Sequence, residues 1–143
     1  MMIGLLLIHS NAMHSGVMYG KEVRRLAADS IDKELLKGTI PFMVLRLIGE
    51  KEVYGYQIIK LLSGLSGELF LFKEGTLYPI LHNLEKDGFI SSYWQESSVG
   101  RKRKYYRITE MGRMQLEKKF QEWERFKSAV DLVLTKEVPE DEN

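Results

Sequence analysis

The stretch EGTLYPILHNLEKDGFI, residues 74–90, decides the fold of this chain. Its apolar residues recur at i, i+3, i+4 and i+7, the spacing of one buried helix face: Leu77, Ile80, Leu81 and Leu84. At about 100° per residue, the opposite side carries an unusual set: Gly75, Pro79, His82 and Lys86, flanked by Tyr78 and Asn83. Because solvated helix faces are normally rich in Glu and Lys, this composition indicates a surface that contacts another molecule.

Two further helices are expected before this stretch. The first has Thr39 as its N-cap, Pro41 in its first turn and Gly49 at its end. The second follows the letters KEVYG and stops near Gly64 and Gly67. Both repeat the helical spacing of apolar residues, with Ile40, Met43, Val44, Leu47 and Ile48 in the first and Ile58, Leu61, Leu62 and Leu65 in the second. The letters ELFLFK, residues 68–73, are expected to be extended.

The third helix is predicted to begin with Thr76 as its N-cap and to end at Gly88. This start places Pro79 at the third helical position, where its missing N–H removes no hydrogen bond. Two β-prone runs follow, FISSYWQE (89–96) and KYYRIT (104–109), separated by SSVGRKR. Because Gly100 suits a bend, these runs predict a β-hairpin with a basic tip.

A long final helix is predicted from Thr109, its N-cap, to Leu134. One side of this helix carries an apolar stripe that so small a domain cannot cover. The stripe therefore predicts a dimer interface formed by Leu116, Phe120, Trp123, Val130 and Val133.

Composition indicates an ordinary globular protein of one domain with an appended helix: 143 residues, 44% hydrophobic and 29% charged. The absence of cysteine excludes disulfides and thiol catalysis, and it is compatible with a reducing cytoplasm. The net charge of +1 hides an uneven distribution. Residues 99–108 hold five cations and no acid, whereas residues 136–143 form an acidic tail.

The chain is expected to divide into four parts: an extension (1–31), a domain of helices and a hairpin (32–108), a dimerisation helix (109–135) and the acidic tail (136–143). In the extension, the letters SNA before Met13 resemble the remnant of an expression tag. Val23, Leu26, Ala27 and Ile31 are then spaced as in a short amphipathic helix. The apolar run MIGLLLI lacks a basic leader and is too short to span a membrane.

Three helices followed by a basic hairpin form the winged helix-turn-helix arrangement, a mainly α fold with a small β-hairpin. Its third helix enters the major groove of double-stranded DNA, and its hairpin contacts the backbone or the minor groove. On this interpretation the tyrosine, histidine and asparagine of residues 75–86 read base edges and phosphates. The basic loop neutralises phosphates and supplies salt-dependent affinity.

Three motifs also resemble the PadR family of bacterial transcriptional regulators: VYGYQII (53–59), EGTLYPILHNLEKDGFI (74–90) and GRKRKYYRITEMG (100–112). The resemblance covers about residues 32–134, and residues 1–31 depart from it. It implies a cytoplasmic homodimer that represses promoters and is usually released by a small molecule. The short segment after the hairpin is similar to the small subtype with a single C-terminal dimerisation helix.

The resemblance assigns residues 75–86 to the recognition helix and residues 100–104 to the hairpin tip, and it places Tyr54 near the phosphate backbone. It also implies that Trp123, with Phe120 nearby, stacks on a planar aromatic inducer in a pore between subunits. The expected DNA contacts are Tyr54, Lys73, Gly75, Thr76, Tyr78, His82, Asn83, Lys86, Arg101, Lys102, Arg103 and Lys104.

Each assignment has a simpler alternative. The alternative for the basic loop is a plain solvated loop, and the alternative for His82 is an ordinary surface histidine. For Tyr78 the alternative is half-buried packing, and for Trp123 it is a place in the core or in an interface. The whole domain is alternatively a winged helix that binds a protein or RNA. An enzyme is disfavoured, since the three histidines lie far apart and no metal-ligand spacing, phosphate loop or nucleophile motif is present. No cofactor and no metal are expected.

Overall fold

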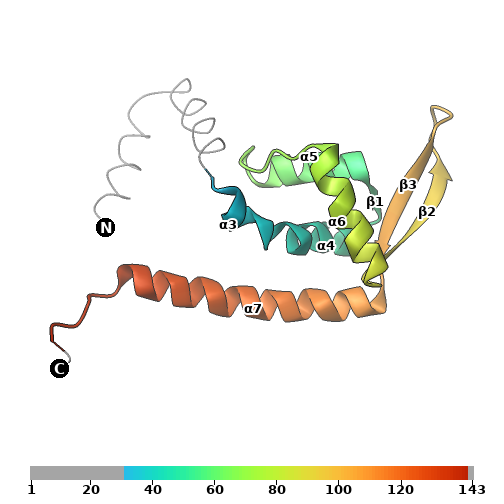
Figure 1. Cartoon of the computed structure of the whole chain (residues 1–143). Helices are drawn as coiled ribbons and strands as arrows, with labels where there is room; N and C mark the ends of the chain where they lie inside the picture. The colour runs from blue at the N-terminus through green and yellow to red at the C-terminus, as the bar shows by residue number, and fades with distance from the viewer. Residues whose placement is uncertain (1–30, 142–143) are drawn as a thin grey trace, which may run out of the picture.

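The computed structural model describes residues 31–141, and the expectations for residues 1–30 lie outside this range. Figure 1 shows a small helical body, a projecting hairpin and one long helix beneath both. The elements are α3 (Lys33–Lys37), α4 (Ile40–Glu50), β1 (Val53–Tyr54), α5 (Gly55–Leu65), α6 (Glu74–Lys86), β2 (Ile90–Glu96), β3 (Lys102–Ile108) and α7 (Glu110–Thr135). The predicted fold class, a winged helix-turn-helix with a long C-terminal helix, is confirmed.

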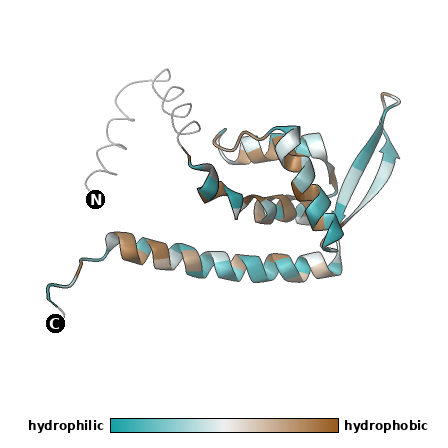
Figure 2. Ribbon diagram, in the orientation of Figure 1, coloured by the Kyte–Doolittle hydropathy of each residue, from teal (hydrophilic) through white to brown (hydrophobic). Residues whose placement is uncertain are grey.

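The core lies between α4, α5 and α6, whose apolar faces meet. Each helix is amphipathic, and Figure 2 shows hydrophobic (brown) residues interspersed with hydrophilic (teal) ones along these helices. The fully buried side chains are Val44, Leu45, Ile48, Val53, Ile58, Leu77, Leu81 and Ile90. They include Leu77 and Leu81 of the predicted buried face of α6, which is therefore correctly assigned.

The small sheet contains a strand that the sequence did not predict. The strand order is β1-β3-β2, with both pairings antiparallel, and Val53 and Tyr54 lie opposite Tyr106 and Tyr105. A strand of two residues shows no alternation, so its pattern cannot be distinguished from a loop. Its consequence is that the hairpin is anchored to the segment between α4 and α5.

The predicted start of the third helix is wrong. The helix begins at Glu74, with Lys73 at the N-cap position, so Thr76 lies inside the first turn and does not cap it. Pro79 is consequently the sixth helical residue, where its missing N–H deprives the carbonyl of Gly75 of its intrahelical partner. Gly75 is exposed, so water can take the place of that N–H.

Two smaller expectations also need correction. Thr39 stands at the N-cap position of α4, but its hydroxyl donates to the carbonyl of Leu36 and caps no N–H. No strand forms over residues 68–73, which run as an irregular loop from α5 to α6. Among residues 31–141, no helix is both long and apolar enough to cross a membrane.

The end of α6, the hairpin and the start of α7 meet at one tight joint. The hydroxyl of Thr109 accepts a hydrogen bond from the N–H of Gly112 at 3.0 Å, which confirms the predicted N-cap. The same hydroxyl donates to the carbonyl of Gly88 at 2.6 Å, and the N–H of Thr109 donates to the carbonyl of Phe89. These bonds fix the direction in which α7 leaves the sheet.

Gly112→Ala should destabilise the protein, because a Cβ atom at this position would overlap the carbonyl of Phe89 and stand 2.7 Å from Cγ1 of Ile108. Backbone cannot yield as a flexible side chain does, so we expect a loss of about 1–3 kcal/mol in the free energy of unfolding. Urea denaturation followed by circular dichroism measures it. Gly64→Ala is the matched control, since no atom lies within 4 Å of a Cβ there. Equal stability of the two variants would contradict the tight joint.

Candidate nucleic-acid interface

The outer face of α6 is a continuous exposed surface with few charges. Leu77, Leu81 and Leu84 are buried in the core, and Ile80 is partly buried against it. The residues of this helix expected to contact DNA, and Lys73 just before it, are all exposed: Lys73, Gly75, Thr76, Tyr78, His82, Asn83 and Lys86. The helix thus presents hydroxyl, imidazole, amide and ammonium groups from its first turn to its last.

Tyr78 combines packing with exposure. A Cβ at Gly55, the first residue of α5, would stand only 3.4 Å from the hydroxyl oxygen of Tyr78, so the ring lies over this glycine. The side chain is still 49% exposed. Support on one side reduces the freedom of the ring, and exposure on the other leaves it available for a contact.

The wing, residues 90–108, carries an uncompensated positive charge at its tip. Gly100, with φ +80°, turns the chain, and the N–H of Ser97 donates to the carbonyl of Arg101. Arg101 and Lys102 are exposed, while Arg103 and Lys104 are partly exposed. Among residues 31–141, none of these four cations is in an ion pair. Their charge is therefore free to meet phosphates.

A column of aromatic rings stiffens the outer face of the sheet. Tyr105 stacks on Tyr93, with centroids 5.7 Å apart, and meets Tyr54 edge-on at 5.5 Å. Guanidinium groups cover both ends, Arg107 at 4.4 Å from the Tyr93 ring and Arg103 at 4.5 Å from the Tyr54 ring. Such contacts each stabilise by roughly 0.5–1 kcal/mol at exposed sites. Tyr54, assigned by resemblance to the phosphate backbone, thus directly supports a wing-tip cation.

Glu52 ties this column to the loop after α4. Its carboxylate accepts a hydrogen bond from the hydroxyl of Tyr93 at 2.7 Å and pairs with Arg107 at 3.2 Å. The bond to this carboxylate raises the pKa of Tyr93, because it stabilises the protonated phenol. The wing is consequently held in one orientation to the helical body by contacts on both of its strands.

A cleft of about 450 Å³ separates α6 from the wing. Its walls include Tyr54 to Tyr56 at the start of α5, Glu74 and Tyr78 of α6, and Trp94 with the four cations of the tip. Trp94 was not among the expected site residues. Its place directly after Tyr93 in a predicted strand was a usable signal, because neighbouring side chains of a strand point to opposite faces of the sheet. Deeper in, burial raises the pKa of Tyr106, and the charge of the nearby Glu85 raises it further.

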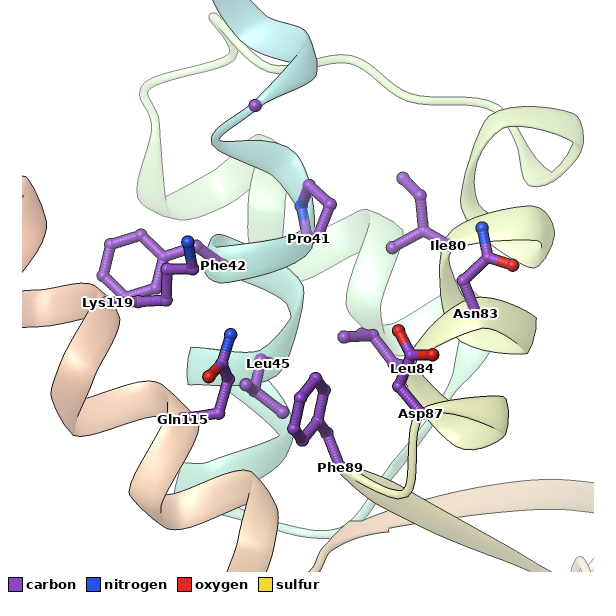
Figure 3. A pocket seen from close by; sticks show the side chains of 11 residues that line it. Pro41, Phe42, Leu45, Ile80, Asn83, Leu84, Asp87, Phe89, Gln115 and Lys119 are labelled. Atoms are coloured by element: carbon purple, nitrogen blue, oxygen red, sulfur yellow. The ribbon is translucent and has the colours of Figure 1, made fainter.

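A second hollow lies on the other side of the body, between α3, the 68–70 loop and α7. It measures about 680 Å³, and Phe42, Phe70, Trp123 and Phe126 supply its aromatic walls. A smaller hollow of about 260 Å³ lies beside it, between α4, the end of α6 and α7 (Figure 3). Phe42 borders both hollows, and the ring of Phe120 packs edge-on against it at 5.0 Å. Of the two expected ligand residues, Trp123 therefore lines the large hollow and Phe120 supports its wall.

The stripe expected to form a dimer interface is divided by the structure. Leu116 packs against the core of its own chain, and Phe120 is engaged with Phe42. Phe120 nevertheless remains 38% exposed, about as much as Trp123 and Val130. Val133, Phe126 and Leu134 are exposed as well. Figure 2 shows the apolar C-terminal half of α7 extending beyond the body. In the part of the chain that the structure describes, no three His, Asp or Glu side chains are grouped as a metal site.

The three-helix body, the projecting basic wing and the exposed polar face of α6 define a winged helix-turn-helix protein. The chain belongs to the PadR-like family of transcriptional regulators, whose family model matches residues 44–118. Such regulators are in general not enzymes.

Three similar proteins illustrate this membership. An uncharacterized protein of Lysinibacillus sphaericus is 38% identical over 104 residues, which are 73% of this chain and 95% of the relative. A transcriptional regulator of Mycobacterium tuberculosis is 36% identical over 84 residues, 59% of this chain and 75% of that protein. The crystal structure of a PadR-like transcriptional regulator from Bacillus cereus superposes with a TM-score of 0.66 at 37% identity, covering 73% of this chain and all of that one.

Proposed function

We propose that this protein is a cytoplasmic, sequence-specific repressor that binds promoter DNA as a homodimer. The observation that carries the proposal is the cleft, which brings Tyr78 of α6 together with four cations of the wing. No ion pair among residues 31–141 includes any of these cations. In this arrangement α6 enters the major groove, and the wing follows the phosphate backbone. The family supports the same conclusion, because transcriptional regulators act on promoters.

A gel shift with the DNA upstream of its own gene tests this function. We expect a discrete complex that survives an excess of unrelated competitor DNA, because base contacts from α6 add to the charge contacts of the wing. Unrelated DNA of equal length is the control. Complete indifference to DNA at low salt would overturn the proposal and leave the protein-binding winged helix as the better interpretation.

The C-terminal half of α7 supports the homodimer. Its exposed apolar side chains form a surface that a second copy, related by a two-fold axis, covers with the same surface. Two recognition helices would then face half-sites about 34 Å apart, one turn of the duplex. On this proposal the dimer, and not the single chain, is the unit that recognises the two half-sites.

The large hollow supports release by a small aromatic molecule. Trp123 is 36% exposed on its wall, beside Phe126 at 6.2 Å. An indole can stack on a planar ligand, which typically gives about 0.5–1.5 kcal/mol beyond burial. Because α7 carries both Trp123 and the dimer surface, a bound ligand would favour one angle between the subunits. A ligand releases DNA only if it prefers the dimer whose helices mismatch the half-sites.

Fluorescence of a Trp94→Phe variant reports on Trp123 alone, since the chain has two tryptophans. Titration with planar aromatic cations and phenolic acids should quench this fluorescence and release operator DNA over the same concentration range. Release is compared with the ligand-free affinity of the same variant, and Trp123→Leu is the control that should lose the response. Release of DNA without quenching would place the ligand elsewhere, and absence of binding would make Trp123 an interface residue only.

A further inference from the structure

Trp94 is a large apolar side chain left in solvent at the wing. It is 65% exposed, and its neighbours on both strands are charged or polar. Among residues 31–141, it takes part in no aromatic pair, whereas Tyr93 beside it is held in the tyrosine column. No cation–π contact within the same residues includes it either. Internal packing therefore does not explain an indole at this position.

The direction of Trp94 follows from the register of the sheet. Side chains alternate along a strand, so Trp94 shares a face with Ile90, whose side chain is buried in the core. Its cross-strand partner is Lys104, and two residues farther along β3 Tyr106 is buried on the same face. Trp94 therefore projects toward the body and not away from it. It reaches the cleft in which α6 presents Tyr78.

The surroundings of Trp94 match a polyanion that also carries apolar rings. Arg101, Lys102 and Lys104 line the same cleft, and none of them is in an ion pair among residues 31–141. Glu74 also lines the cleft, but the cations outnumber it, so the lining is positively charged overall. An apolar protein partner would have to desolvate these cations without compensation. A nucleic-acid backbone alternates phosphates with the apolar faces of its sugars, so it can satisfy the cations and the indole together.

We propose that Trp94 is a DNA-contacting residue whose indole packs against a deoxyribose ring of the backbone strand that the wing follows. The inference rests on the proposed function and adds to it a contact of a different physical kind. Charge contacts weaken steeply as salt rises, because their strength comes from released counterions. Contact between an indole and a sugar releases no counterion, so it preserves part of the affinity at high salt.

Salt dependence separates this role from a structural one. Trp94→Ala should weaken binding roughly tenfold, within the range that aromatic contacts to nucleic acids supply. The slope of log K against log salt should stay unchanged, and Trp94→Phe should recover part of the affinity. Leu65→Ala is the matched control, since Leu65 is an apolar residue that is at least as exposed as Trp94 and lies at the far end of α5. Unchanged circular dichroism and thermal midpoint would show that the exposed Trp94 is not needed for folding.

Protection of Trp94 from oxidation, measured on the unmodified protein, gives an independent test of the contact. Hydroxyl radicals oxidise exposed tryptophan, and peptide mass spectrometry reads each tryptophan separately. Operator DNA should slow the oxidation of Trp94 several-fold and leave Trp123, on the other side of the body, unaffected. Oxidation of Trp94 at the same rate with and without operator DNA would overturn the inference.

The two levels of proposal fail in different ways. If no DNA is bound at low salt, the proposed function itself fails. If DNA is bound but Trp94 is oxidised at the free rate and Trp94→Ala binds normally, only the indole contact fails. A reduced salt slope in Trp94→Ala would also overturn it, because Trp94 would then act by positioning the phosphate-binding cations.

Discussion

Val130→Glu combined with Val133→Glu should give a monomer that keeps its helices and has little remaining affinity for operator DNA. Val130 is 36% exposed and Val133 81% exposed on α7, so neither substitution disturbs the core of the chain itself. Buried against a second copy, four glutamates would repel one another and lose their hydration. Phe120 is a poorer choice, because its ring also packs on Phe42 of the same chain, so its substitution would remove a contact within the chain as well.

The expected decrease in affinity is large because the proposed dimer would bind two half-sites together. Linking two binding modules typically raises affinity by about 100- to 10,000-fold over one module alone. Sedimentation velocity at micromolar concentration measures the assembly, circular dichroism the helix content, and a gel shift the affinity. Gln121→Glu with Ser128→Glu places the same charges on the opposite, exposed side of α7 and should remain dimeric. Sedimentation of the unmodified chain as a monomer would contradict the dimer directly.

Neutralising the tip of the wing by Arg101→Gln, Lys102→Gln and Arg103→Gln should weaken binding to operator and unrelated DNA about equally. These side chains contact phosphates on the proposed interface, and phosphates carry no sequence information. The slope of log K against log salt should fall by roughly 0.9 for each phosphate that is no longer neutralised, or about 5 for the two wings of a dimer. Titrations at several salt concentrations measure this slope.

The triple variant of the wing has a matched control and can be compared with a more selective double variant. Arg113, Lys118 and Arg125 are exposed cations of α7, and replacing them by glutamine should leave the slope unchanged. The double variant Arg101→Gln with Lys102→Gln leaves Arg103 packed on the Tyr54 ring. It therefore tests the effect of charge without disturbing the tyrosine column. An unchanged slope in the triple variant would show that the wing tip is a solvated loop.

The sequence was most informative where one element carries a repeating pattern. The spacing of Leu77, Leu81 and Leu84 predicted both faces of α6, because a helix of 13 residues repeats its pattern several times. Thr109 was recognisable as an N-cap because it directly precedes an acidic residue and a long helical pattern. Both features depend on residues close in the chain.

The features that could not be predicted depend on residues distant in the chain. The column joins Glu52 and Tyr54 to Tyr93 and Tyr105, and its partners are known only once the register of β2 and β3 is known. Trp94 was overlooked for the same reason, since its orientation follows from that register. Thr76 was preferred as the N-cap on residue type, whereas α6 begins three residues earlier, with Lys73 at its N-cap position and no side-chain cap.

The joint at Gly112 makes α7 a mechanical lever. The hydrogen bonds of Thr109 and the close fit of Gly112 join this helix to the wing and to the end of α6. The wing and α6 are therefore expected to turn with α7 as one piece. A helix of 26 residues is about 39 Å long, and a pivot of about 10° at its far end sweeps the near end through about 7 Å. A displacement of this size is about the rise of two base pairs. Small rotations where two copies meet would thus be amplified into a change of register on the duplex.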